Sequence, residues 1–274
     1  MKIKKWARLM MLGLCVMTLS TFGVISGANA TLWTLTDTNS TVTIDSQSQT
    51  GMSNWVVDGI DNLFQQWFWY GIGTGPEFSI DTLTLTSETL YSPSILELVY
   101  SNNLISVDVI YFLTGGSIGS GNSDVGETIV IKNLTETSLN LRFFQYTDFD
   151  LGGTPNDDTA YRSNANTMHQ TDGSGYTFSE VVGTPAASHY QVDIFPTTLS
   201  ALNDLLPTTL LDNPGPVTGD VTFAWQWNTV LNPGGSYIIS KDKLIDVNPV
   251  PEPATILLIG AGLMGVYAVS RKRG

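Results

Sequence analysis

The sequence predicts an all-β fold: an antiparallel β-sandwich of a dozen or more strands with one short helix, plus a single C-terminal transmembrane helix. Polar and apolar residues alternate with a period of two through most of residues 31–246, which is typical of strands that bury one face. Only one segment of this region has a helical period, and Gly, Pro, Asn and Ser separate the alternating runs. This combination favours a two-sheet sandwich.

Residues 1–30 have the pattern of a cleaved signal peptide. Basic residues come first, residues 9–25 carry no charge, and Ala28-Asn29-Ala30 offers the small-x-small sequence that a signal peptidase accepts. The alternative is an N-terminal transmembrane helix, but the apolar run is short and no charged stop follows it. We therefore expect cleavage after Ala30 and export of the protein.

Cys15 is the only cysteine of the chain and lies inside this segment. The exported protein would then have no cysteine at all. Its absence excludes disulfides, thiolate nucleophiles and cysteine metal sites from the exported part, although an exported compartment permits disulfides.

The exported part is strongly acidic. Residues 31–250 contain 5 basic and 24 acidic residues, a net charge of −19. Such a charge repels phosphate backbones, so nucleic acid is not an expected partner. The many aromatic and β-branched residues argue against disorder. We expect one folded domain over residues 31–246, which is long enough to build a sizeable core.

The alternating runs predict the individual strands. TLWTLT, TVTID, DTLTLT and VTFAWQWN each place apolar residues on one face. Two pairs of β-rich runs, joined around residues 101–103 and 134–138, predict hairpins. The single helix is expected after a cap at Thr197 or Thr198, and Pro207 would stop it. Its apolar face consists of Leu199, Leu202, Leu205 and Leu206.

No metal site is predicted, and the nearest candidate for one is an acidic loop. Asp148, Asp150, Asp157 and Asp158 surround a Gly-Gly turn, and calcium prefers carboxylate and carbonyl oxygens on a loop that can wrap it. The spacing departs from the EF-hand pattern, and no bidentate Glu closes the ring. Because Asp also initiates turns and caps backbone donors, a structural role is the alternative. No cofactor is expected.

Catalytic motifs are weak, so the chain is predicted not to be an enzyme. Gly115 to Gly119 matches G-x-S-x-G, but a strand rather than the required helix is expected after it. His169 and His189 lie in no metal-ligand spacing. With 24 acidic residues in the exported part, some pair will always suit glycoside hydrolysis, and the sequence selects none.

Tryptophans are the other candidates for ligand contacts. The run WFWY at residues 67–70, and Trp225 with Trp227, could stack on sugar rings or fill the core of a sandwich. We expect the core, because each sheet of a sandwich buries one face.

The C-terminal tail favours a membrane segment. Residues 254–270 carry no charge and span roughly 25 Å as a helix. Arg271, Lys272 and Arg273 would remain cytoplasmic, and the proline-rich residues 247–253 form a spacer. The spacing G-x-G-x-x-G also occurs here, but only nine residues follow its last glycine, Gly265, so a dinucleotide fold has no room.

Val250-Pro251-Glu252-Pro253, the apolar segment and the basic residues 271–273, in this order, resemble the PEP-CTERM sorting signal of Gram-negative bacteria. The resemblance implies transient anchoring in the inner membrane and recognition by an exosortase. Release to the cell surface or extracellular matrix would follow, in a bacterium that also makes exopolysaccharide. The exported part is similar to β-sandwich proteins that carry this tail.

The expected function is therefore a structural or adhesive role in the envelope or matrix, linked to exopolysaccharide. The alternative is a carbohydrate-binding module or a carbohydrate-active enzyme, in which aromatic and acidic residues line one sheet.

Overall fold

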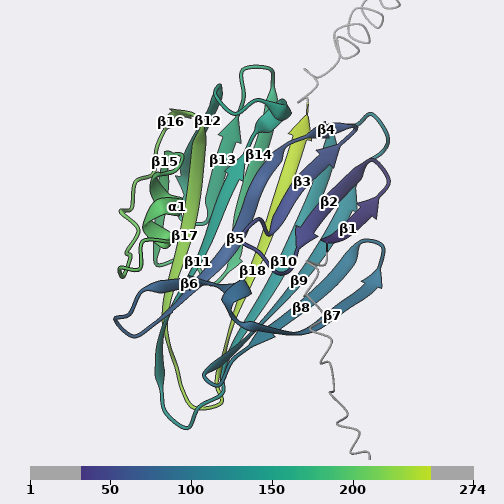
Figure 1. The fold of residues 1–274 in the computed structure, drawn as a ribbon. Helices are drawn as coiled ribbons and strands as arrows, with labels where there is room; N and C mark the ends of the chain where they lie inside the picture. The colour runs from purple at the N-terminus through teal and green to yellow at the C-terminus, as the bar shows by residue number, and fades with distance from the viewer. Residues whose placement is uncertain (1–31, 248–274) are drawn as a thin grey trace, which may run out of the picture.

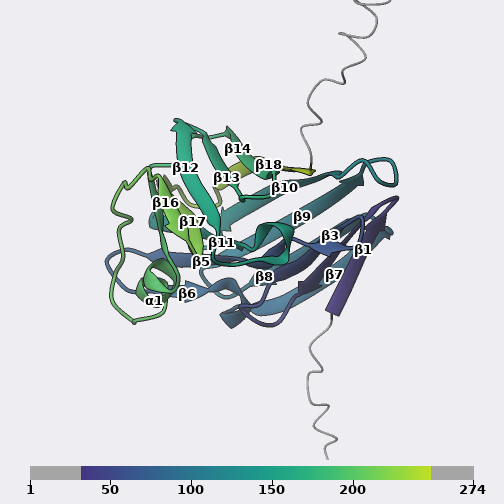
Figure 2. The same ribbon diagram turned by 90° about the horizontal axis from the view of Figure 1, so that it is seen from above.

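Two antiparallel sheets of nine strands each pack face to face in the computed structural model, which describes residues 32–247 (Figures 1 and 2). The all-β prediction is confirmed for these residues. The predicted signal peptide, the transmembrane helix, the basic tail and all of the spacer except Val247 lie outside the described residues. Among the described residues, none of the helices has the length and hydrophobicity that a membrane span requires.

Sheet 1 runs in the order β1-β2-β3-β5-β11-β17-β15, with β4 beside β3 and β6 beside β5. Its strands are β1 (Leu32–Asp37), β2 (Ser40–Asp45), β3 (Met52–Val57), β4 (Ile60–Asp61), β5 (Leu63–Ile72), β6 (Glu77–Ser79), β11 (Leu139–Phe149), β15 (His189–Ile194) and β17 (Val221–Leu231).

Sheet 2 runs in the order β16-β12-β13-β14-β18-β10-β9-β8-β7. Its strands are β7 (Thr84–Ser92), β8 (Ile95–Ser101), β9 (Ile105–Gly115), β10 (Asn122–Asn133), β12 (Asp158–Asn164), β13 (Thr167–Thr171), β14 (Tyr176–Thr184), β16 (Val217–Gly219) and β18 (Ser236–Val247).

The predicted helix is present, but it is shorter than the segment of sequence that has a helical pattern of leucines. α1 (Thr197–Leu202) ends five residues before Pro207, and it lies beside sheet 1 (Figure 2). Two 3-10 turns, η1 (Ile80–Thr82) and η2 (Leu151–Gly153), complete the described elements. The Asn203 side chain accepts a hydrogen bond from Trp69 Nε1 at 3.2 Å, so the end of α1 is fixed on the outer face of β5.

The core lies between the sheets and is rich in aromatic rings. Phe178 of sheet 2 stacks on Phe223 of sheet 1 with a centroid distance of 5.9 Å and contacts Phe149 at 3.9 Å. Along β9 and β10 buried and part-exposed residues alternate, because successive side chains point to opposite faces of a sheet.

Four ionisable side chains lie fully buried in this interior. They form an interior charge cluster of Glu127, Glu180, Lys241 and Lys243. Lys241 Nζ lies 2.5 Å from Glu127 and 3.3 Å from Glu180, and Lys243 pairs with Glu127. Two glutamines of sheet 1 complete the cluster, since Gln145 and Gln66 accept hydrogen bonds from the lysines.

Burial and the two lysines act in opposite directions on the cluster. Desolvation raises the pKa of Glu127, but attraction to Lys241 and Lys243 outweighs it and holds the pKa well below its ordinary value. Burial lowers the pKa of Lys243 to about 8, although Glu127 opposes this change. At neutral pH the cluster therefore holds ionised groups of both signs inside the sandwich.

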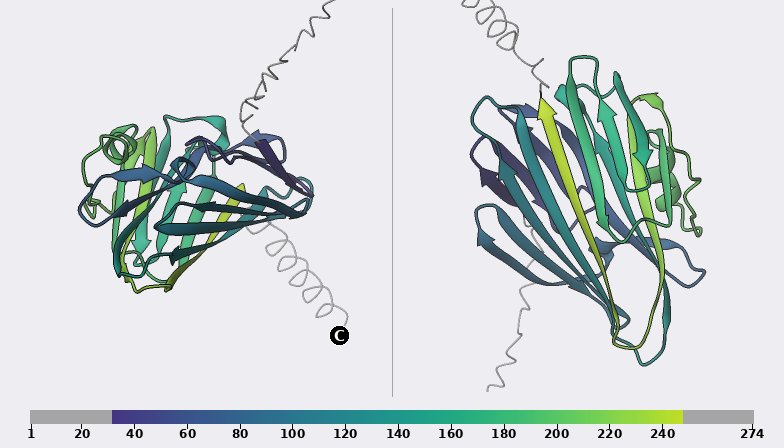
Figure 3. Two further views of the ribbon diagram at one scale, coloured as in Figure 1. Left: turned by 60° about the horizontal axis from the view of Figure 1, so that its bottom comes forward. Right: turned by 180° about the vertical axis from the view of Figure 1, so that it is seen from behind.

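One predicted hairpin is confirmed and the other is wrong. β8 and β9 pair across residues 102–104 as expected. β10 and β11 do not pair: β10 lies between β9 and β18 in sheet 2, and β11 lies between β5 and β17 in sheet 1. Residues 134–138 therefore cross from one sheet to the other at one end of the sandwich (Figure 3).

Candidate functional site

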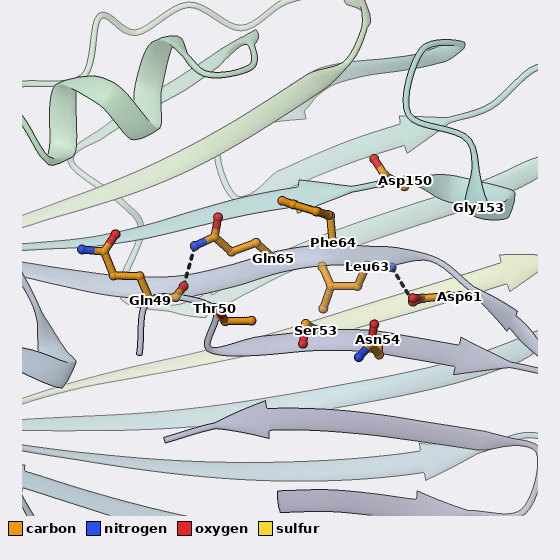
Figure 4. Close-up of a pocket in the computed structure, with 10 residues that line it drawn as sticks. All are labelled: Gln49, Thr50, Ser53, Asn54, Asp61, Leu63, Phe64, Gln65, Asp150 and Gly153. Atoms are coloured by element: carbon orange, nitrogen blue, oxygen red, sulfur yellow. Dashed lines mark hydrogen bonds between the residues drawn. The ribbon is translucent and has the colours of Figure 1, made fainter. Parts of the chain in front are cut away.

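An open groove of about 650 Å³ lies over sheet 1, between β3 and β5 (Figure 4). The two strands are paired in the ladder only at Met52 and Gln66. The groove lies where they are no longer paired. The groove is lined by Gln49, Thr50, Ser53, Asn54, Asp61, Leu63, Phe64, Gln65, Asp150 and Gly153.

A bulge on each strand shapes the groove. In β3, Asn54 and Trp55 together lie opposite the single residue Val42 of β2, and the φ of 49° at Asn54 is a left-handed conformation that Asn tolerates. In β5 the pairing with β11 skips Phe64. Phe64 is 59% exposed although its neighbours on the strand are buried, because an extra residue in a strand is turned out of the ladder.

Buried Asn62 connects the groove to the loop that follows β11. Its side-chain oxygen accepts a hydrogen bond from Gly152 N at 3.0 Å, and its amide donates to Ile60 O at 2.9 Å. Its main-chain oxygen accepts one from Asp150 N at 3.1 Å. Asp150 is therefore held beside Phe64 by hydrogen bonds from a fully buried residue.

Three aspartates come together at the acidic end of the groove. Asp148, Asp150 and Asp220, which we call the aspartate trio, each offer a carboxylate oxygen within 4.8 Å of the others. With Phe64, Pro155 and Phe195 they line a second hollow of about 210 Å³. Because Phe64 and Asp150 line both hollows, the trio forms one end of the groove.

Strand pairing explains this meeting. β11 and β17 are antiparallel, and Asp148 lies opposite Thr222. Continuing this register by two residues places Asp150 opposite Asp220, and residues two apart on a strand share a face. Two carboxylates of the trio thus lie across from each other, and Asp148 lies diagonal to Asp220.

Asp148 is the most deeply placed member of the trio, only 2% exposed. Its Oδ2 accepts a hydrogen bond from the Tyr146 hydroxyl at 3.1 Å, whereas its Oδ1 is buried without a hydrogen-bond partner. Desolvation raises the pKa of Asp148 to about 7, with further contributions from the neighbouring aspartates. Burial, followed by the charge of Asp220, raises the pKa of Asp150 to about 6.

Only two of the four aspartates in the acidic loop lie together in the structure. Asp148 and Asp150 lie together, but Asp158 points into the interior, where it accepts hydrogen bonds from Leu151 N at 3.1 Å and Gln170 Nε2 at 2.6 Å. Asp157 is exposed and lies outside the trio. The third carboxylate beside Asp148 and Asp150 belongs to Asp220, which lies 62 residues after Asp158.

The predicted burial of the tryptophans is confirmed, although not all of them lie between the sheets: Trp69 is on the outer face of β5, where its Nε1 donates to Asn203 at the end of α1. Trp67, Trp69, Trp225 and Trp227 are fully buried, so none of them forms an exposed platform. The ring that does face the groove is Phe64, which no motif or alternation in the sequence marks.

The G-x-S-x-G segment joins β9 to β10 as expected and has a structural explanation. A Cβ on Gly115 would lie 2.1 Å from Asp37 O, so the close approach of this turn to β1 requires glycine. Asp58 accepts hydrogen bonds from Gly119 N and Gly121 N, and these backbone donors lower its pKa. The glycines therefore fasten the β9–β10 turn to sheet 1.

The two histidines have ordinary surroundings. His169 on β13 stacks on Tyr161 at a centroid distance of 5.5 Å, and burial lowers its pKa. His189 begins β15, and its Nδ1 lies 3.0 Å from Asp212 Oδ2.

A family model described as the PEP-CTERM protein-sorting motif matches residues 249–273. This match agrees with the resemblance seen in the sequence and identifies an exported protein with an exosortase sorting signal. It covers the tail and says nothing about the exported part. No curated protein matches the chain.

Solved structures show the fold of the exported part. A bacterial glucoamylase, crystallised with acarbose, is similar over 86% of this chain and 36% of its own, with 8% identity and a TM-score of 0.56. The chain thus spans about a third of that enzyme. A putative aldose 1-epimerase from Escherichia coli K12 is similar over 80% of this chain and 100% of its own, with 10% identity and a TM-score of 0.55. At such identities the likeness extends to the fold alone.

Proposed function

We propose that this chain is an exosortase substrate whose exported β-sandwich has a structural or adhesive, non-catalytic role at the cell surface or in an exopolysaccharide matrix. The observation that carries the proposal is the sorting motif at residues 249–273. The signal-like residues 1–30 support it, because together the two ends provide export, temporary anchoring and release.

The body of the protein supports a structural role. Of its 25 aromatic side chains in residues 32–247, 15 are buried, among them every tryptophan except Trp33. Two sheets of nine strands give a rigid, cysteine-free unit suited to an exported matrix. The tryptophans that would have supported the carbohydrate alternative are buried.

The sorting step is tested by Glu252→Ala in a host that has the processing machinery. We expect the wild-type protein to lose its tail and to reach the surface or medium, and the variant to stay in the inner membrane at the mass of the anchored form. Glu136→Ala, on the exposed β10–β11 connection, is the control and should be processed normally. Equal mass and location of Glu252→Ala and wild type would contradict the proposal.

A second candidate function is carbohydrate binding in the groove. It is favoured by the exposed Phe64 ring, which lies among the polar side chains of Asn54, Asp61 and Gln65. A ring set among hydrogen-bonding groups is the arrangement that stacks on a sugar face while the polar groups fix its hydroxyls. The glucoamylase and epimerase folds are compatible with this candidate.

Glycan-array binding and product analysis separate the two candidates. If the protein is structural only, neither binding nor cleavage products should appear. If the groove binds sugar, Phe64→Ala should abolish binding. Phe112→Ala, at a 39% exposed ring on the other sheet, should leave it intact. Equal binding by both variants would exclude the groove.

A further inference from the structure

We propose that the aspartate trio of Asp148, Asp150 and Asp220 binds a divalent cation of the calcium class. This site differs from the acidic loop considered in the sequence, because its third carboxylate, Asp220, lies directly before β17. It is independent of the function proposed above, since a structural or a sugar-binding protein could equally contain it.

The spacing of the three carboxylates is the first observation. Their oxygens lie within 4.8 Å of one another, which is closer than the roughly 5 to 9.5 Å between carboxyl groups that act on either side of a glycosidic bond. Oxygens that each lie about 2.4 Å from one calcium ion are necessarily within about 4.8 Å of one another. The trio therefore fits a shared ion better than a sugar ring.

The second observation is the orphaned oxygen of Asp148. Asp148 is only 2% exposed to solvent, and its Oδ1 has no hydrogen-bond partner among the described residues. A buried carboxylate oxygen without a donor is costly, and Asp148 lines the same hollow as Asp150 and Asp220. A cation in that hollow would satisfy it.

No protein cation takes this role. Among the described residues, none of the ion pairs involves the trio, and the lysines of the sandwich interior are paired with Glu127 and Glu180. Three carboxylates face one another, and no positive side chain of residues 32–247 pairs with them, which is the situation that an added divalent ion relieves.

Ligand chemistry favours calcium. All three donors are carboxylates, which are hard oxygen ligands, and no histidine lines the hollow. The hollow of about 210 Å³ leaves room for the waters that would complete a coordination number of six to eight. An exported protein meets calcium at concentrations that match weak extracellular sites.

The test uses the full-length chain in mild detergent, stripped with chelator and titrated with CaCl2 or MgCl2 by calorimetry. We expect one saturable calcium site. At a hundredfold excess over Kd the melting temperature should rise by about 5 to 10 °C, with a smaller rise in MgCl2. Terbium offers a local readout, since Tyr146 donates to Asp148 and would sensitise its luminescence.

Variants locate the site. Asp150→Asn and Asp220→Asn should weaken calcium binding about tenfold or more, while in chelator each should melt no lower than wild type because a repulsion is removed. Asp157→Asn, an exposed neighbour in sequence, should bind as wild type does.

The proposal is overturned if no saturable binding occurs up to about 10 mM CaCl2, well above the weakest extracellular sites. Unchanged affinity in Asp150→Asn and Asp220→Asn would overturn it equally. Neither result depends on Asp148 variants, which could fail to fold, or on the sorting experiment.

Discussion

The interior charge cluster shows how one residue can determine the stability of the sandwich. Within residues 32–247, Glu127 is the only carboxylate that contacts both Lys241 and Lys243, and all three side chains are fully buried. Desolvating charges costs several kcal/mol each and is offset only while every charge has a partner. The stability of the cluster therefore depends on the charge of Glu127, which pairs with both lysines.

Replacing this residue should be severe. Glu127→Gln keeps the shape and removes the charge, so Lys243 would lose its ion-pair partner while Lys241 keeps Glu180. We expect the free energy of unfolding to fall by about 3 to 5 kcal/mol, measured by urea denaturation. The same change at exposed Glu136 should alter it by less than about 0.5 kcal/mol. A loss at Glu127 below about 1 kcal/mol would mean that water or protonation already compensates the lysines.

A second residue-scale effect concerns pH. Asp124 and Asp242 lie on the outer face of sheet 2, on β10 and β18. Burial, followed by the charge of Asp242, raises the pKa of Asp124 to about 7. A carboxyl group whose pKa is raised on folding stabilises the native state while it is protonated, below its unfolded pKa near 3.8. That stability is lost as pH rises through 7.

Asp242→Asn should remove part of this loss. We expect the variant to melt about 2 to 4 °C above wild type at pH 8, corresponding to about 1 kcal/mol after allowance for solvent screening. The two proteins should melt together near pH 4. Calorimetric scans in chelator, which exclude any divalent ion, measure the difference. A gain of the same size at both pH values would show that repulsion between the two carboxylates is not its cause.

At the scale of elements, the connection between β10 and β11 shows where sequence patterns stop being informative. Alternation and turn residues describe a strand, a loop and a strand whether the second strand pairs with the first or crosses to the other sheet. The deciding contacts are distant in sequence: the amide of Asn133 donates to Leu231 O at 3.0 Å and Asn232 O at 3.1 Å. No local pattern contains that information.

Asn133 should therefore be essential to this crossing. Besides those two bonds, its amide donates to Thr137 O at 2.7 Å and its oxygen accepts from Thr135 N at 2.8 Å. Asn133→Ala would leave buried Leu231 O and three part-buried backbone groups without this partner, and we expect a loss of about 2 to 4 kcal/mol in the free energy of unfolding. Thr135→Ala, on the same loop, should cost about 1 kcal/mol or less. Comparable losses in the two variants would contradict a special role for Asn133.

The candidate site was predictable to the same extent as the fold. Asp148 and Asp150 were found because they lie close in sequence, beside the Gly-Gly turn. Asp220 was missed because its place depends on the register between β11 and β17, and Phe64 because a bulge, rather than alternation, exposes it. Composition and periodicity identified the strands and the aromatic core, whereas pairing partners and bulges come from long-range contacts.

At the scale of the whole molecule, charge is distributed more unevenly than the count suggests. Of the five basic residues in residues 32–247, Lys241 and Lys243 are buried, and Arg142 pairs with buried Glu77 at 2.6 Å. Lys132 and Arg162 are the remaining cations, whereas 19 of the 24 acidic residues are outside the buried set. The surface is therefore almost uniformly negative.

Such a surface makes the fold repel itself, and salt should relieve the repulsion. Screening shortens from about 30 Å at 10 mM salt to about 3 Å at 1 M. In chelator at pH 8 we expect NaCl, raised from about 10 mM to about 0.5 M, to increase the melting temperature by about 2 to 5 °C. Near pH 4, where many carboxylates are neutral, the gain should be smaller. A fall in melting temperature at pH 8 would mean that surface attractions outweigh the repulsion.

The negative surface also limits the polymers that this protein can bind. An anionic polymer would be repelled. A matrix polymer that binds directly should therefore be neutral, or be joined through divalent ions such as the one proposed at the aspartate trio.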